Sequence, residues 1–183
     1  MSGNDFLSYT TRVSELLRNT NQEGIRNLLI AMKNTMANQG TIFVIGNGGS
    51  ASTASHFSND LRIIAQRRGV MIKVFSLTDN SASITAIGND IKFSEIFKSQ
   101  LNGILNNNDL VFCISASGNS SNLISAVKYA TEVGAQTVSL VGFDGGTLSK
   151  ISHFYCLVPS LIGEYEPTED VHLSICHYLA MNI

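Results

Sequence analysis

Charged side chains are scarce in this sequence. Only 14% of the 183 residues are Asp, Glu, Lys or Arg, whereas 44% are hydrophobic. A charge content this low predicts extensive burial, with surfaces between subunits as one place for it. The formal net charge of −2 and the sequence pI near 6.0 give no electrostatic basis for binding nucleic acid.

The sequence also has few cysteines and no long apolar run. Cys113, Cys156 and Cys176 are odd in number and form no CxxC pair, so we expect buried, reduced thiols and no nucleophile among them. No apolar run approaches the length that spans a membrane, and the first 13 residues lack a basic region followed by an apolar core. We therefore expect a cytoplasmic protein that makes no membrane contact.

The most informative stretch runs from Thr41 to Asp60, TIFVIGNGGSASTASHFSND. Its short apolar start, 42–45, predicts a buried strand, and residues with helical spacing follow the turn GNGGS. Glycines let the backbone approach a ligand closely, and a helix N-terminus favours an anion. The turn therefore predicts a phosphate cradle, and we count Gly48 and Gly49 among its binding residues.

A dinucleotide site is the alternative interpretation of this turn. Gly46, Gly48 and Ala51 satisfy the pattern G-x-G-x-x-[GA]. Such a site needs an acidic residue about 20 positions further on, at the end of the second strand. The first carboxylate after that strand is Asp79, which lies well beyond this spacing. The dinucleotide interpretation is therefore disfavoured.

Strand and helix alternate along most of the chain. After two N-terminal helices between residues 5 and 37, we expect strands at 42–45, 70–77, 109–115, 136–142 and 154–158. Helices are expected after the first turn, around 84–91, and at 93–105, 121–133 and 168–181. Nearly continuous apolar strands predict a parallel sheet covered on both faces, an α/β three-layer sandwich in one domain, 1–183. Of the N-terminal helices, 1–40, the second should lie on the sheet, whereas the first has less to pack against in such a unit, so we expect this region to contribute to oligomerisation.

A second turn, SASGNSS at 115–121, follows the third expected strand. Its four serines offer hydroxyl and amide donors at the start of a helix, which suits a phosphate held by many hydrogen bonds. The alternative is an ordinary serine-capped loop. Since the carboxyl ends of parallel strands share one edge, this turn should lie near the Gly46 turn, which favours the phosphate site.

Ionisable side chains are expected on two helices. His56 and Asp60 are four residues apart and share a helix face; the alternative interpretation is a surface ion pair. The closing helix adds Glu169, His172 and His177. Glu169 and His177 lie about 12 Å apart along a regular helix, so they can meet one ligand only if Glu169 sits at the frayed helix start. If Asp60 and Glu169 lie close together, each raises the other's pKa unless a cation lies between them.

Five segments of the sequence, in this order and spacing, resemble one known family. They are GNGGSASTASHFSNDL, SLTDNSASITAIGND, ISASGNSSNL, GFDGG and EDVHLSICH. Together they resemble the sugar isomerase (SIS) fold and, within it, the phosphoheptose isomerases. The resemblance covers essentially the whole chain. It implies a five-stranded parallel sheet in flavodoxin-like order, and a homotetramer with sites shared between subunits. The implied activity converts sedoheptulose 7-phosphate to D-glycero-D-manno-heptose 7-phosphate for lipopolysaccharide or capsule heptose.

The resemblance also implies which residues bind the sugar phosphate. They lie in turns after the strands and at the end of the second segment: Asn47, Gly48, Gly49, Ser50, Asp90, Ser115, Ser117 and Ser120. The three serines of the second turn would hold the phosphate. Asn47 and Ser50 would contact the sugar.

The family commonly binds zinc through a His and a Glu of one helix and a Gln and a His of the last. The matching positions here are His56, Asp60, Glu169 and His177, so Asp replaces Glu and Glu replaces Gln. Ala116 also stands where a Thr is common. His177 with either Asp60 or Glu169 is then the candidate acid–base pair. The replacements are compatible with a base moved to Glu169 and zinc held by two imidazoles and two carboxylates, with a different sugar phosphate, or with lost activity.

Two other functions compete with the isomerase. One is a non-catalytic SIS tetramer that serves as a scaffold for the initiator protein DnaA. The other is isomerisation of a different ketose phosphate. Retention of two histidines and two carboxylates favours an enzyme, because a scaffold has no chemical need for them.

Overall fold

The strands of the chain lie parallel in the order β2-β1-β3-β4-β5. They are β1 (Thr41–Gly46), β2 (Lys73–Ser76), β3 (Leu110–Ser115), β4 (Gln136–Val141) and β5 (Phe154–Leu157). The structure is a computed structural model that describes residues 5–183, so residues 1–4 of the expected domain and of the expected N-terminal helices lie outside it. The flavodoxin-like order confirms the predicted α/β architecture.

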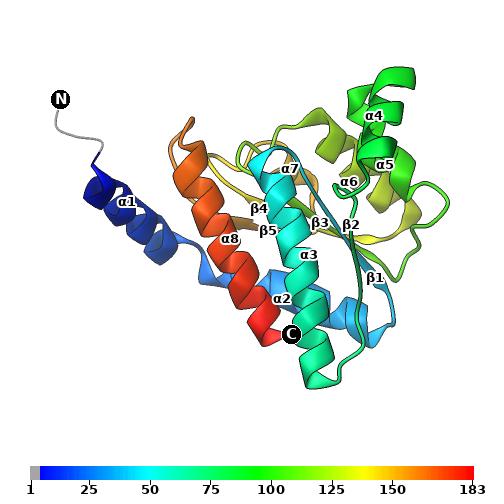
Figure 1. The fold of residues 1–183 in the computed structure, drawn as a ribbon, viewed down its shortest axis with the longest axis horizontal. Helices are drawn as coiled ribbons and strands as arrows, with labels where there is room; N and C mark the ends of the chain where they lie inside the picture. The colour runs from blue at the N-terminus through cyan, green and yellow to red at the C-terminus, as the bar shows by residue number, and fades with distance from the viewer. Residues whose placement is uncertain (1–4) are drawn as a thin grey trace.

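Helices cover both faces of this sheet (Figure 1). The first group is α1 (Phe6–Asn19), α2 (Gln22–Ala37), α3 (Gly49–Arg68) and α8 (Tyr165–Asn182). The second group is α4 (Ser81–Asp90), the 3₁₀ turn η1 (Phe93–Glu95), α5 (Ile96–Leu101), α6 (Ser121–Val133) and α7 (Leu148–Ile151). The sheet with these two groups forms the three layers.

The side chains of each strand point alternately to the two faces of the sheet, and this divides the core into two clusters. In β1, Ile42 and Val44 join the cluster that includes Phe57 of α3 and residues of α2 and α8. Their neighbours Phe43 and Ile45 join the cluster formed with α5, α6 and α7. Successive side chains of a strand point to opposite faces, so one apolar run packs both helical layers onto the sheet.

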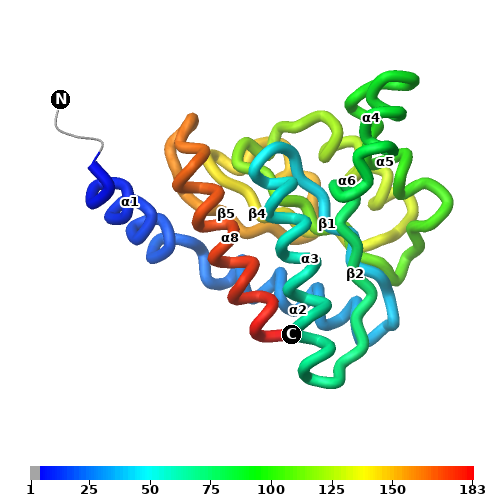
Figure 2. Tube along the Cα trace, viewed as in Figure 1, coloured from blue at the N-terminus to red at the C-terminus, as the bar shows by residue number. Residues whose placement is uncertain are grey.

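Helix α1 lies beside α8 and extends from the body of the protein (Figures 1 and 2). Its Leu16 is buried in the first core cluster, whereas Phe6 and Leu7 are 80% and 73% exposed. The helix therefore has more to pack against than we expected, since α1 contacts α8 and Leu16 joins the core. Its exposed apolar end still fits a role in assembly.

The second strand is shorter than the expected range 70–77. Only Lys73–Ser76 pair with β1, opposite Thr41–Val44, and Val70 and Met71 are exposed. Because β2 lies at the edge of the sheet, hydrogen bonds to a single neighbour set its length. An apolar run alone could not show where that pairing ends.

Two helix boundaries also differ from the expectation. The range 93–105 divides into η1 and α5, and α5 ends at Leu101, shortly before Gly103 with its positive φ of 83°. The closing helix starts at Tyr165 and not at 168. Its first turn includes Pro167, and proline is tolerated there because those N–H groups have no partner within the helix. Short α7 was not expected.

Three expectations from composition can be compared with the structure. Cys113, Cys156 and Cys176 are buried and free within the described chain, and burial raises the pKa of Cys113 and of Cys156 to about 12. The expected reduced, unreactive thiols fit this burial. Among the helices of residues 5–183, none is both long enough and apolar enough to cross a membrane.

His172 of α8 is fully buried, and neither ring nitrogen has a hydrogen-bond partner within residues 5–183. Burial lowers the pKa of this imidazole from 6.5 to about 4. The folded protein therefore holds His172 neutral over a pH range in which the unfolded chain binds a proton there.

This burial predicts acid-sensitive stability. Because the folded pKa is depressed, the free energy of unfolding should fall as pH drops below 6.5 and level off near 4, by about 3 kcal/mol from this group. Urea unfolding at pH 7 and pH 4.5 measures the loss. The loss of unfolding free energy between these pH values should be smaller in His172→Leu and unchanged in His153→Gln, which changes an exposed histidine. An equal acid loss in His172→Leu would contradict the assignment.

Candidate active site

The β1–α3 turn and the β3–α6 turn leave the sheet side by side. Gly46 at the end of β1 pairs with Ile114, one residue before the end of β3. Strand β2 lies on one side of β1, and β3, β4 and β5 lie on the other, so the strand order switches between β1 and β3. Ligands of open α/β sheets bind at such a switch point, outside the carboxyl ends of the strands. Both turns predicted from sequence therefore face one place.

The β1–α3 turn depends on its glycines. Gly48 has φ 53° and ψ −125°, a conformation that L side chains rarely adopt. Gly49, the first residue of α3, is exposed, whereas Ser50 is buried. The free N–H groups of the first turn of α3 thus open toward the switch point, as an anion cradle requires.

The serine turn is ordered by its own side chains. Ser115 Oγ accepts the N–H of Gly118 at 3.0 Å, and Ser117 Oγ accepts that of Asn119 at 3.3 Å. Ser120 is the N-cap residue of α6, and its hydroxyl makes no capping bond within the described residues. The turn therefore combines a fixed backbone with a hydroxyl at the positive end of a helix.

The GFDGG segment supports the serine turn from behind. A methyl group built on Gly118 would lie 2.1 Å from the carbonyl oxygen of Gly145, so the two backbones touch. Asn119 Oδ1 accepts the N–H of Thr147 at 2.9 Å, and Leu148 donates its N–H to the Gly118 carbonyl at 2.9 Å. The segment carries part of the family resemblance, and the structure gives it a supporting role.

Asn122 joins the two turns, and the sequence analysis missed it. The side-chain amides of Asn47 and Asn122 donate to each other at 2.9 and 2.8 Å. Asn122 Oδ1 also accepts the N–H of Leu123, and the residue is buried. A polar amide on the buried face of α6, among Leu123 and Ala126, is the sequence signal that could have identified it.

Asp90 stands apart from these turns. It ends α4, is exposed, and accepts a hydrogen bond from Asn89 Nδ2 at 2.8 Å. Within the described residues, no hydrogen bond or ion pair joins it to the other expected site residues. Its role in substrate binding stays a prediction.

His56, Asp60 and His177 converge between α3 and α8. The two Nε2 atoms lie 3.1 Å apart, and Asp60 Oδ2 lies 3.2 Å from His56 Nε2 and 3.6 Å from His177 Nε2. The side chains are 51%, 25% and 45% exposed, respectively, so a ligand can reach them. The expected helix pair is therefore joined by a histidine from a distant part of the chain.

Glu169 does not belong to this group. A methyl group built on Gly49 would lie 2.1 Å from Glu169 Oε2 and 2.7 Å from Oε1, so the carboxylate lies against the first residue of α3. Burial raises the pKa of Glu169, and Glu166 and Asp170 raise it further. Asp60 is not among these causes, so the expected crowding of Asp60 with Glu169 is not found. The frayed helix start is not found either, because α8 begins four residues before Glu169.

The group of three could hold a metal ion. Two imidazoles and one carboxylate form a donor set that zinc accepts, and three protein ligands leave a position for water or substrate. A tetrahedral site with bonds of about 2.0–2.1 Å has donor atoms about 3.3 Å apart. The separations of 3.1, 3.2 and 3.6 Å bracket that value.

Comparison with known proteins gives the family. A profile described as the SIS domain matches residues 5–142. The chain belongs to the SIS domain family. A phosphoheptose isomerase of Helicobacter pylori (strain P12) is 34% identical over 177 residues, which are 96% of this chain and 90% of that protein. The phosphoheptose isomerase of Aliarcobacter butzleri (strain RM4018) is 32% identical over 181 residues, covering 98% and 93%. Within the SIS family, the chain groups with the phosphoheptose isomerases.

The solved structures agree with this grouping. The SIS fold of this chain matches that of a phosphoheptose isomerase from Francisella tularensis with a TM-score of 0.89 and 28% identity, over 98% of this chain and 94% of the other. The SIS profile ends before α8, whereas this match includes nearly the full length. The recognised resemblance is thus confirmed at the level of family and fold.

The amide pair between the two turns predicts a binding defect. Asn122→Ala removes both bonds between this buried residue and Asn47 and should cost about 1–3 kcal/mol of stability. It should also weaken binding of inorganic phosphate or sugar phosphate several-fold, because the two turns are no longer fixed to each other. Thermal unfolding and titration calorimetry measure the two effects. Asn107→Ala, an exposed change at the opposite edge of the sheet, is the control; equal affinities in both variants would contradict the role.

Proposed function

We propose that this protein is a phosphoheptose isomerase. It would convert sedoheptulose 7-phosphate to D-glycero-D-manno-heptose 7-phosphate, a precursor of lipopolysaccharide or capsule heptose. The relatives from H. pylori and A. butzleri and the structure from F. tularensis carry that name. The observation that carries the proposal is the placement of Glu169 against Gly49, the first residue of the helix that also carries His56 and Asp60.

The reaction needs a phosphate site and a base at opposite ends of the sugar. A ketose becomes an aldose when a base removes a proton from C1, an enediol forms, and a proton returns to C2 while a hydroxyl proton passes from O1 to O2. Ser115, Ser117 and Ser120 would anchor the phosphate, and Asn47, Gly48, Gly49 and Ser50 would contact the sugar. An anchored phosphate fixes the reacting carbons relative to the base.

Glu169 is the base that the geometry favours. Burial raises its pKa, as do the neighbouring Glu166 and Asp170, and a general base works best when its pKa approaches the working pH. Asp60 and His177 were the other expected catalytic residues. They face each other and His56, so we assign them to holding a metal ion.

The metal we propose is zinc, held by His56, Asp60 and His177. Zinc would polarise the carbonyl oxygen and stabilise the negative charge that develops on it. Glu169, expected as a fourth ligand, would remain a base because its carboxylate is turned to Gly49. The convergence of imidazoles also speaks against the DnaA scaffold, and no feature of the fold favours that alternative.

The remaining parts of the proposal are assembly and location. We propose a homotetramer to which α1 contributes, and the exposed Phe6 and Leu7 support this. Leu161 and Ile162, 67% and 82% exposed in the loop before α8, are further exposed apolar side chains. A cytoplasmic location stays a prediction from the sequence, as does the choice among ketose phosphates.

Turnover tests the proposed reaction. Wild type should isomerise sedoheptulose 7-phosphate, and Glu169→Gln should lower kcat about 100-fold or more because the amide cannot take the proton. KM should change less, since the phosphate turns are intact. A panel of shorter ketose phosphates gives the specificity. Glu132→Gln, the same change at an exposed carboxylate of α6, is the matched control. Full turnover in Glu169→Gln would remove this residue from the mechanism.

Metal content tests the three-ligand site. Protein dialysed against buffered zinc should retain about one ion per chain, and His56→Gln and His177→Gln should each lose it, because two ligands hold zinc far more weakly than three. Elemental analysis measures the ratio. His153→Gln is the control, since His153 contacts Thr137 and lies outside the group. Zinc retained in the His177 variant would contradict the assignment.

A further inference from the structure

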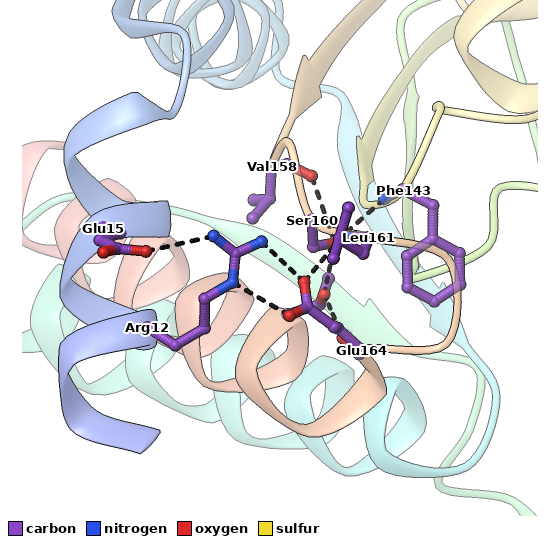
Figure 3. Close-up of polar contacts among 8 residues, drawn as sticks. Arg12, Glu15, Phe143, Val158, Ser160, Leu161 and Glu164 are labelled. Atoms are coloured by element: carbon purple, nitrogen blue, oxygen red, sulfur yellow. Dashed lines mark hydrogen bonds and ion pairs between the residues drawn. The ribbon is translucent and has the colours of Figure 1, made fainter. Parts of the chain in front are cut away.

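Two side-chain contacts fasten α1 to the start of α8. Arg12 binds Glu164 through two parallel bonds, Nε to Oε1 at 3.0 Å and Nη2 to Oε2 at 2.8 Å (Figure 3). Tyr9 Oη donates to Asp170 Oδ2 at 2.5 Å. Arg12 and Glu164 are 31% and 26% exposed, so this is a partly desolvated, bidentate pair. Such a pair fixes geometry better than an exposed single contact does.

Glu164 also connects the Arg12 contact to the first turn of α8. Its Oε2 also accepts the N–H of Leu161 at 2.7 Å, which closes the loop before the helix (Figure 3). Its backbone carbonyl oxygen lies 2.5 Å from Oγ1 of Thr168, which is fully buried. Thr168 Oγ1 lies 2.6 Å from Ser160 Oγ, and that oxygen accepts the N–H of Phe143 at 3.1 Å. Arg12 is thereby linked to the residue that precedes Glu169.

The two contacts from α1 lie on either side of Glu169 in the sequence. Arg12 holds Glu164, at the start of α8, and Tyr9 holds Asp170, the next residue after Glu169. Four carboxylates fall between 164 and 170, and like charges so close repel one another. The guanidinium offsets part of that repulsion where the helix begins. The first turns of α8 can then keep Glu169 directed at Gly49.

We propose that Arg12, acting through Glu164, is a positioning residue for Glu169. Helix α1 is then a part of the catalytic site as well as a surface for assembly. This inference rests on the proposed function only where it concerns catalysis. The positioning itself is a property of the fold and can be measured without substrate.

Hydrogen exchange of the full-length protein tests the positioning. In Arg12→Ala, the hydrogen-bonded amides within residues 165–170, those of Thr168, Glu169 and Asp170, should exchange about 5- to 10-fold faster than in wild type, as expected for the loss of a partly buried ion pair. Amides of α6 should not change. Glu15→Gln is the matched control, because Glu15 contacts the same guanidinium at 3.3 Å from within α1. Unchanged exchange at 165–170 in Arg12→Ala would overturn the proposal whatever the activity.

Steady-state kinetics test the consequence for catalysis. Arg12→Ala should lower kcat about 10-fold with KM within about 2-fold, since a displaced base slows chemistry while the phosphate turns are untouched. Arg12→Lys should restore part of kcat. On a Glu169→Gln background, Arg12→Ala should cause no further loss, because the two residues act through one group.

Several results would overturn the catalytic role. One is faster exchange with unchanged kcat, and another is a full, independent loss of kcat on the Glu169→Gln background. A third is a fall in kcat that light scattering shows to accompany dissociation, since α1 would then act through assembly. If wild type turns over no ketose phosphate, the proposed function fails, and hydrogen exchange still decides the positioning.

Discussion

The packing of α3 against α8 is the constraint on which the rest of the structure depends. Both helices start at the carboxyl edge of the sheet, one after β1 and the other after the loop that follows β5, and they lie side by side (Figure 1). Gly49 meets Glu169 near their starts, and His56 meets His177 further along. The steps between these contacts are seven and eight residues, rises of about 10 and 12 Å. Because the two helices lie side by side and the rises between their contact residues are similar, both contacts can form at once.

Buried neighbours set the direction of the two histidines. Phe57, next to His56, and Cys176, next to His177, are both fully buried in the same core cluster. Adjacent residues of a helix point about 100° apart, so burying one of them turns the other toward the groove between the helices. The arrangement of His56 and His177 is thus a consequence of core packing, which also explains how half-exposed side chains keep a fixed geometry.

The sequence was sufficient for the features that local chemistry determines. Apolar runs predicted the strands, and GNGGS predicted the turn. The four-residue spacing predicted that His56 and Asp60 share a helix face, and the two side chains are in contact. The joining of His177 to that pair rested on family resemblance, because no local pattern relates residues that are 121 positions apart. The start of α8 was predicted three residues too late, at 168 and not at 165, because a proline in the sequence does not show whether it precedes a helix or lies in its first turn.

Contacts between distant turns could not be predicted in the same way. The Asn47–Asn122 pair, the support of Gly118 by Gly145 and the Arg12–Glu164 pair each join segments whose distance follows from the fold alone. Apart from Asn122, a polar residue on the buried face of α6, each partner taken singly has an ordinary surface or loop composition. These contacts are also the ones that give the site its rigidity, so the sequence identified the chemistry of the site before it could show what holds it in place.

The two departures from the family's usual ligands have separate structural consequences. Asp60 still reaches both imidazoles, so the loss of one methylene does not remove it from the group. Glu169 is withdrawn to Gly49, which keeps a second carboxylate away from Asp60. A glutamine there could serve as a neutral ligand but could not take a proton, whereas a desolvated glutamate with a raised pKa can. The replacements therefore suit the proposed site, in which three residues would hold a metal ion and the fourth position would supply the base.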